Sequence, residues 1–312
     1  MPRGLSPEFL DAFLNGLLKP VLDRVKRDNT LDFQIRTDEV HIYYRGGKIL
    51  GITPKPRGGF VFSFDPNYFG ASEFPELSDK VQSQEEIGLW IDTLPALKQA
   101  MDYHLTTKKE TLEREFQQLV VRENNYSRVS NDTDYFIVDC EYVHRDFREA
   151  RMDLVAFKWL SQSQARQRGE VQLAFIELKY GDGALAGDSG LLDHVRSMRA
   201  IIQDQAALNV TAEEMKKVFA QKRKLGLVRF GQGGNEHEVD SFVPGAPEVM
   251  LLLINHKPAS TILSRELNAL DAEARETVKV ATASFMGYGL YAEGILTLEE
   301  FCTRYTAQFP SE

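Results

Sequence analysis

Residues 247–256, PEVMLLLINH, constrain the fold more than any other segment because nearly all of them are apolar. A strand without a polar face is buried on both sides, which places it at the centre of a sheet covered by helices. Three further runs of strand length, rich in β-branched and aromatic residues, precede it at 135–143, 152–160 and 171–180. Together these runs predict a layered α/β core.

Helical patterns surround the predicted strands. Apolar residues recur at helical spacing from about residue 92 to residue 125. Further helices are expected at 191–207, 211–225 and 260–274, the last beginning after Ser260 as its cap. From residue 108 onward the predicted order is helix, three strands, two helices, strand and helix.

The N-terminal part predicts a separate small α+β module. Residues 7–28 have helical periodicity, and residues 31–53 alternate apolar with polar positions. Arg45, Gly46, Gly47 and Lys48 separate two apolar runs, as in a hairpin turn. We therefore expect three parts, which are an α+β module at 1–72 interpreted as a structural appendage, a helical connector at 73–107 and the main domain at 108–312.

The composition excludes several classes of protein. The chain has 312 residues with 43% hydrophobic and 27% charged residues, which is typical of a globular protein. Its two cysteines exclude a disulfide framework, and no apolar stretch is long enough to span a bilayer. A reducing, cytoplasmic location without a membrane partner is expected. The net charge of −9 is unusual for a nucleic-acid-binding protein and stands against that function.

Charged residues enter two of the apolar runs. Glu177 and Lys179 lie two residues apart in LAFIELKY, so a strand points both side chains to one face. Asp153, in RMDLVAF, occupies the preceding run, and adjacent strands can bring it within a few ångströms of Glu177. The alternative is a solvated face, where charge pairs of this kind are common. Charges within an otherwise apolar run favour a site.

Two carboxylates and a lysine suit a hard divalent cation. Oxygen ligands are preferred by Mg²⁺ and Mn²⁺, and Asp153 and Glu177 are the candidate metal ligands. A bound metal lowers the pKa of a water molecule and stabilises charge that develops at phosphorus. Lys179 is placed to orient or deprotonate that water.

Asp153, followed 24 residues later by Glu177-Leu178-Lys179 within this order of elements, resembles the PD-(D/E)xK nuclease superfamily. The resemblance covers about residues 108–256, and Met152 stands where the family has proline. It implies a restriction-endonuclease-like mixed sheet flanked by helices. It also implies Mg²⁺ or Mn²⁺ as cofactor, Asp153 and Glu177 as metal ligands, and Lys179 as the catalytic lysine. DNA as the substrate is implied by the resemblance alone.

Further site residues follow from the same comparison. Many members of the superfamily add a glutamate from the preceding helix, and Glu115 is chosen over Glu113 and Glu123 because it borders the apolar face. Asp139 and Glu141 are rivals, since they share a strand parity with Ile137. His194 is a candidate for contact with a phosphate. The dense basic stretch adds Lys222, Arg223 and Lys224 as candidates for nucleic-acid binding, with a solvated helix end as the alternative.

The sequence thus predicts a Mg²⁺-dependent phosphodiesterase that acts on DNA, with the possibility of a homodimer left open. Two alternatives remain. One is a catalytically inactive nuclease fold that serves binding or assembly. The other is a nucleotide-binding α/β protein that uses the glycine loop at Gly181, Gly183 and Gly187, although its spacing does not match a dinucleotide fingerprint.

Overall fold

The computed structural model describes residues 2–69, 77–107, 112–126, 133–187, 190–230, 237–256, 260–283, 290 and 295–306. The chain divides into two compact units. Unit 1 contains Met1–Arg122 and Lys217–Arg229, and unit 2 contains Glu123–Lys216 and Phe230–Glu312. This division differs from the predicted boundaries, because the segment expected as a connector packs within unit 1 and because the chain returns to unit 1 after residue 216.

Unit 1 is built on an antiparallel sheet in which consecutive strands pair. Its strands are β1 (Leu31–Ile35), β2 (Val40–Tyr44), β3 (Gly47–Pro54), β4 (Phe60–Ser63) and β5 (Lys80–Val81). Arg45 and Gly46 join β2 to β3 with φ values of 48° and 75°. A two-residue hairpin turn requires positive φ at both central positions, so the predicted hairpin is confirmed.

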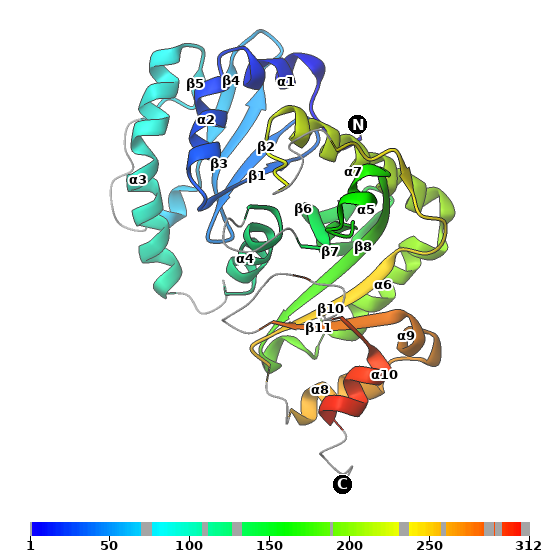
Figure 1. The fold of residues 1–312 in the computed structure, drawn as a ribbon. Coiled ribbons are helices and arrows are strands. Elements are labelled where there is room, and N and C mark those ends of the chain that lie inside the picture. The colour runs from blue at the N-terminus through cyan, green and yellow to red at the C-terminus, as the bar shows by residue number, and fades with distance from the viewer. Residues whose placement is uncertain are drawn as a thin grey trace. The chain divides into compact units, whose positions relative to one another are not determined.

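Helices accompany the sheet of unit 1 (Figure 1). They are α1 (Pro7–Leu14), α2 (Lys19–Arg27), the short 3₁₀ helix η1 (Pro66–Phe69), α3 (Gln84–Thr107) and the first part of α4 (Leu112–Tyr126). The single helix predicted over residues 7–28 is therefore two. The second restarts with Pro20 in its first turn, where the missing N–H of proline costs no helical hydrogen bond. The predicted helix over residues 92–125 is likewise divided between α3 and α4.

Unit 2 contains a mixed sheet in the order β12-β11-β10-β8-β7-β6. Its strands are β6 (Tyr135–His144), β7 (Phe147–Lys158), β8 (Glu170–Tyr180), β10 (Glu248–Ile254), β11 (Val278–Ala283) and β12 (Leu296–Thr297), and β9 (Ser241–Phe242) pairs with the start of β8. Strand β10 runs parallel to both β8 and β11, and every one of its residues is buried. The prediction of a central strand at 247–256 is confirmed.

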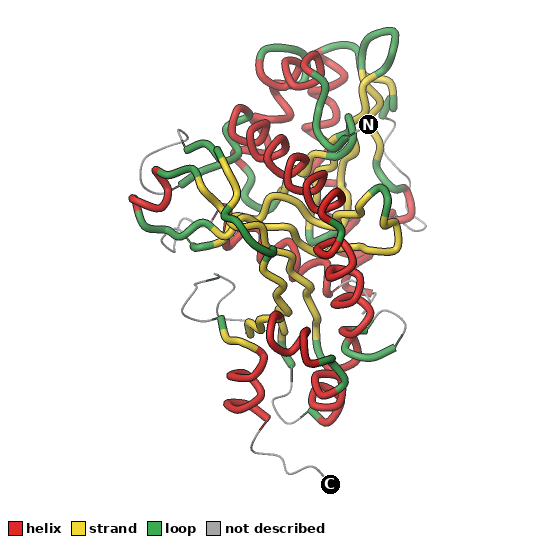
Figure 2. Tube along the Cα trace, turned by 90° about the vertical axis from the view of Figure 1, so that its right-hand side faces the viewer, coloured by secondary structure: helices red, strands yellow, loops and turns green. Residues whose placement is uncertain are grey.

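Unit 2 also contains helices (Figure 1, Figure 2). They are α5 (Ser163–Gln167), η3 (Asp182–Ala184), α6 (Leu191–Gln203), the first part of α7 (Gln205–Lys224), α8 (Thr261–Asn268), α9 (Ala272–Thr277), α10 (Leu298–Phe301) and the π-helical turn η6 (Cys302–Thr306). The rest of α7, from Lys217 onward, belongs to unit 1. The Ser260 side chain accepts a hydrogen bond from the Leu263 amide and caps α8 as predicted. The chain is thus a mixed α/β protein with two sheets flanked by helices. Among the described residues, no helix combines the length and apolarity that crossing a bilayer demands.

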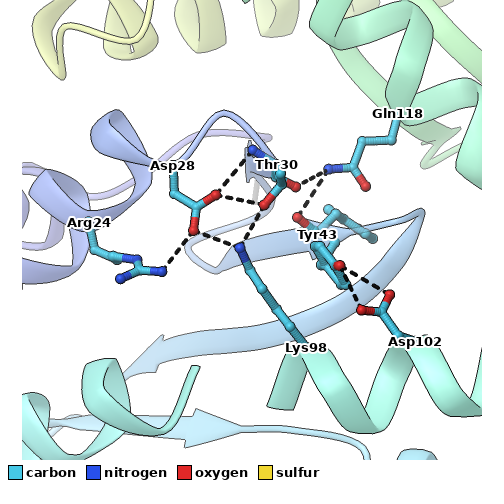
Figure 3. A network of polar contacts seen from close by, with 8 residues as sticks. Arg24, Asp28, Thr30, Tyr43, Lys98, Asp102 and Gln118 are labelled. Carbon is cyan, nitrogen blue, oxygen red and sulfur yellow. Dashed lines mark hydrogen bonds and ion pairs between the residues drawn. The ribbon is translucent and has the colours of Figure 1, made fainter. Parts of the chain in front are cut away.

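A polar network around Asp28 joins α2 to the sheet and helices of unit 1 (Figure 3). The Asp28 carboxylate accepts hydrogen bonds from Arg24 Nη2 at 2.8 Å, from Thr30 Oγ1 at 2.6 Å and from Lys98 Nζ at 2.6 Å. Gln118 Nε2 donates to the Thr30 carbonyl at 2.9 Å. Burial alone would raise the pKa of Asp28, but the hydrogen bonds from Lys98 and Thr30 outweigh it and lower that pKa to about 2.

This pKa predicts a pH-dependent stability. A carboxylate whose pKa is lower in the folded than in the unfolded chain stabilises the fold above its unfolded value of 3.8, and the stabilisation disappears as the pH falls towards about 2. We expect Asp28→Asn to lower the free energy of unfolding by on the order of 2 kcal/mol at neutral pH. Urea unfolding followed by circular dichroism between pH 7 and pH 2 checks this. If the difference in free energy of unfolding between the wild type and Asp28→Asn stayed constant from pH 7 to pH 2, this prediction would be wrong.

Candidate functional site

The candidate site lies at the carboxyl end of β8 in unit 2. The paired positions across the sheet are Leu251 with Glu177 and Leu253 with Lys179, so both charged side chains stand on one face beside apolar neighbours from β10. Glu177 is fully buried, and Lys179 is 4% exposed. A buried carboxylate and a buried ammonium are rare unless they neutralise each other or serve a ligand.

Asp153 occupies the point where β7 and β8 stop pairing. The ladder between these strands ends at Leu154 and Ile176. One residue further, the Asp153 carboxylate accepts a hydrogen bond from the backbone amide of Leu178 at 2.8 Å. The side chain takes the place that a strand carbonyl would otherwise occupy. Asp153 is therefore held at the amide between Glu177 and Lys179, on the strand next to theirs.

Two side-chain nitrogen atoms lie close to the same oxygen of the Glu177 carboxylate. Lys179 Nζ lies 2.8 Å and His194 Nδ1 3.1 Å from Glu177 Oε1. Neither contact has the orientation of a hydrogen bond, and within the described residues both oxygens of Glu177 lack a hydrogen-bond partner. Buried oxygens without a hydrogen bond carry a desolvation cost that a ligand can relieve.

Helix α6 brings His194 to this face of the sheet. Its buried stripe of Leu191, Val195 and Met198 packs towards β7 and β8, and His194 borders that stripe. The sequence predicted that His194 contacts a phosphate. In the structure its ring faces Glu177, which makes it a neighbour of the candidate metal ligands.

A bulge in β6 adds a further buried acid to the same face. Ile137 pairs with Ala156, but Asp139 pairs with Val155, so the irregularity between them turns these two side chains to opposite faces. Asp139 then shares the face of Glu177, and it is fully buried with its carboxylate accepting from the Cys140 amide at 2.9 Å. The prediction that Asp139 lies on the same face as Ile137 is therefore wrong, because the alternation of apolar and polar residues does not reveal a bulge. The other rival, Glu141, forms an ion pair with Arg151.

The donor set suits a hard cation with few protein ligands. Asp153 and Glu177 offer carboxylate oxygens, which Mg²⁺ accepts while it keeps several waters. No group of three or more histidine, cysteine, aspartate or glutamate side chains with metal-binding geometry occurs within the described ranges. Among the described residues, any cation at this site would therefore have at most two of these protein ligands.

The predicted Glu115 is engaged elsewhere. It lies on α4 within unit 1, where Arg45 Nε and Nη2 donate to its two carboxylate oxygens at 2.8 and 3.1 Å. The hydrogen bonds that Arg45 donates to Glu115 raise the pKa of the Arg45 guanidinium above its ordinary value. Both oxygens of Glu115 are thus occupied by a bidentate ion pair that fixes the β2–β3 hairpin to α4.

The predicted nucleic-acid-binding residues differ in accessibility. Lys222 is fully buried and its ammonium donates to Gln34 Oε1 at 2.9 Å, so the prediction that it contacts a phosphate backbone is wrong. Lys222 lies on the buried face of α7, and a run of basic residues in the sequence does not show which of them are buried. Arg223 is half-buried, and Lys224 is exposed.

The glycine loop after β8 is a turn. Gly181 has a φ of 65° and its amide donates to the Ile254 carbonyl at 2.9 Å, and Gly187 has a φ of 100°. Side chains are disfavoured at both positions, so glycine is explained by backbone conformation alone. These residues give no specific support to nucleotide binding.

A further buried carboxylate, outside the candidate site, was not predicted from the sequence. Glu248, at the start of β10, accepts a hydrogen bond from the buried hydroxyl of Tyr135 and binds Lys158 Nζ at 2.8 Å and Lys279 Nζ at 2.6 Å. Burial tends to raise the pKa of Glu248, but the hydrogen bonds from Lys158, Lys279 and Tyr135 outweigh it, so the pKa lies below its usual value. Burial and the negative charge of Glu248 raise the pKa of Tyr135 far above its usual range.

Comparisons with protein-family models, with curated proteins and with solved structures each gave no match to this chain.

Proposed function

We propose that this protein is a metal-dependent nuclease that hydrolyses phosphodiester bonds in DNA, with a restriction-endonuclease-like fold in unit 2. One observation carries the proposal. The Glu177 carboxylate is fully buried without a hydrogen bond in the described part of the chain, beside the buried ammonium of Lys179 and the Asp153 carboxylate on the next strand. A purely structural acid in the interior would be expected to have its oxygens satisfied.

The order of elements supports the same proposal. Helix α4, strands β6, β7 and β8, helix α6 and strand β10 occur in this order along the chain, with α5 between β7 and β8, η3 between β8 and α6, and α7 and β9 between α6 and β10. This is the helix–strand–strand–strand–helix–strand order on which the resemblance to PD-(D/E)xK nucleases depends. Similar folds support different functions, so the chemistry must come from the site itself.

The residues divide into metal ligands and a base or positioning group. Asp153 and Glu177 would hold Mg²⁺ or Mn²⁺, and the bound ion would supply a water of lowered pKa and positive charge for the phosphate oxygens. The amide of Leu178 holds Asp153 in a fixed orientation. Lys179, held 2.8 Å from Glu177, would orient the attacking water and accept its proton. His194 Nδ1 lies 3.1 Å from the same oxygen of Glu177 that Lys179 contacts.

Replacement of Glu177 tests the proposal directly. We expect Glu177→Gln to reduce cleavage of plasmid, linear and single-stranded DNA by at least about a hundredfold, because a ligand charge and several kcal/mol of stabilisation at phosphorus are lost. The assay uses Mg²⁺ or Mn²⁺ with an EDTA control, and Mn²⁺ binding is followed by electron paramagnetic resonance. Glu170→Gln is the matched control, since Glu170 is an exposed glutamate at the other end of β8. Equal activity of the two variants would refute the assignment.

One observation favours an inactive nuclease fold as the second candidate. The described residues contain no group of three histidine, cysteine, aspartate or glutamate side chains that could hold a metal ion. In addition, Lys179 and His194 both contact Glu177. A salt-bridged cluster of this kind can be purely structural. The same assay decides between them. An inactive fold would show neither metal-dependent cleavage nor Mn²⁺ binding in the wild-type protein.

A further inference from the structure

The net charge of the chain conceals a strong asymmetry between the two units. Unit 1 contains 21 lysines and arginines against 18 aspartates and glutamates, which gives +3. Unit 2 contains 16 against 28, which gives −12. The acidity that stood against nucleic-acid binding therefore belongs to the unit with the candidate site. Because a local field depends on the distribution of charge, unit 1 can attract an anion although the whole chain is acidic.

Two basic segments that are far apart in the sequence meet in unit 1. The last turn of α2 contributes Lys26 and Arg27, and the segment Lys217–Arg229 contains five basic and no acidic residues. Arg229 Nη2 donates to the carbonyl oxygen of Lys26 at 3.1 Å. The Lys26 ammonium also lies against Gly226, where a Cβ atom would stand only 3.0 Å from Nζ. The two segments are thus in direct contact.

We call the residues Lys26, Arg27, Lys224 and Arg229 the basic surface. Arg27, Lys224 and Arg229 are exposed, and none of these three has an ion pair with a carboxylate in the described part of the chain. Burial lowers the pKa of Lys26, Asp23 opposes this, and the neighbouring Arg229 lowers the pKa further. The positive charges of the basic surface therefore repel one another, and a bound polyanion would reduce this repulsion.

The nearby acids are already neutralised by other cations. Asp23 pairs with Lys19 at 2.5 Å, and Asp28 pairs with Arg24 and Lys98 at 2.8 and 2.6 Å. Two acids are thereby matched by three cations outside the basic surface, so they leave its positive charge uncompensated.

We propose that the basic surface binds the sugar–phosphate backbone of a nucleic acid, so that unit 1 is the module that captures the substrate. The second part of this statement rests on the proposed nuclease function of unit 2. Lysine and arginine side chains bind backbone phosphates without regard to sequence and release counterions in doing so. Sequence-independent capture of this kind would offset the repulsion between a nucleic acid and the acidic unit 2.

A membrane surface is a poorer match for the same charges. Binding of a helix to a lipid surface needs apolar side chains that enter the bilayer. The apolar residues of α2, Val21, Leu22 and Val25, are all buried. The exposed large apolar residues described in unit 1 are Leu89 and Tyr103, and both belong to α3.

The test measures binding without cleavage. Anisotropy of a fluorescein-labelled DNA duplex is recorded in EDTA at several salt concentrations for the wild type and for Arg27→Gln/Lys224→Gln. The matched control is Arg57→Gln/Lys80→Gln, which removes the same charge from two exposed positions elsewhere in unit 1. We expect the slope of log K against log salt to become shallower by about 2 in the first variant and to stay unchanged in the control. Arg27→Lys/Lys224→Arg should restore the wild-type slope.

The outcomes separate this proposal from the nuclease function. Equal slopes in the two glutamine variants would overturn the basic surface, whether or not the protein cleaves DNA. Binding of phosphatidylserine vesicles in place of DNA would also overturn it. A basic surface that behaves as expected in a protein without metal-dependent cleavage would overturn the nuclease function alone. The fold of both glutamine variants is verified by thermal unfolding, which should give the same midpoint as for the wild type.

Discussion

Lys179→Ala is expected to reduce DNA cleavage by about 10²–10⁴-fold, the range that a positioned acid–base group contributes. The Nζ atom of Lys179 lies 2.8 Å from Glu177 Oε1, and the side chain is only 4% exposed, so bulk solvent cannot readily take over its role. The two carboxylates remain, and Mn²⁺ binding measured by electron paramagnetic resonance should persist. Loss of turnover with retained metal binding would distinguish this lysine from a metal ligand.

A conservative variant sharpens the test of Lys179. Arginine keeps the positive charge but does not release its proton in proteins. If Lys179 accepts a proton, Lys179→Arg should be as inactive as Lys179→Ala, whereas a purely electrostatic role would leave substantial activity. Lys80→Ala is the control, because Lys80 is an exposed lysine on β5. Cleavage by Lys179→Ala at the wild-type rate would end its assignment to the site.

Glu248→Ala is expected to lower the free energy of unfolding by about 3 kcal/mol. This is the lower end of the range for the loss of one partner from a buried ion pair, since the side chains of Lys158 and Lys279 are 21% and 34% exposed and can reach water. The Tyr135 hydroxyl, in contrast, is fully buried and would lose its acceptor. Urea unfolding followed by circular dichroism measures the loss, and Glu170→Ala provides an exposed control on β8.

The pKa of Glu248 makes this prediction depend on pH. The pKa is lower in the folded protein than in the unfolded chain. Glu248 therefore stabilises the fold above its unfolded pKa of 4.5, and this contribution falls as the pH drops through the lower, folded value. The difference between wild type and Glu248→Ala should shrink on acidification. A difference that grows at low pH would mean that the carboxylate is not the charged partner of the two lysines.

Periodicity and apolar runs were sufficient to predict most strands of the sheet in unit 2. β10 was predictable because a run without polar residues suits a strand covered on both faces. Helix boundaries were less accurate. The helix predicted at 7–28 is interrupted between Leu14 and Lys19, and periodicity continues across that break because both helices bury apolar residues at similar spacing.

The candidate site was partly predictable for a related reason. Glu177 and Lys179 share a face by strand alternation, and Asp153 was expected on the neighbouring strand. Asp139 could not be placed because a bulge changes the face of every residue after it. Lys222 could not be recognised as buried, because its partner Gln34 lies 188 residues away in the sequence. Contacts of this kind exist only in the folded chain.

The path of the chain through unit 1 has a consequence for how this protein can be divided. Leu5 and Gln221 exchange two backbone-to-amide hydrogen bonds at 2.8 Å, and residues 217–229 include the buried Val218, Phe219, Leu225 and Val228. A polypeptide that lacked its first 122 residues would retain this segment and leave its apolar side chains without their native neighbours. Unit 1 therefore cannot be separated intact from unit 2 by cutting the chain at one position, because its two stretches of sequence fold together.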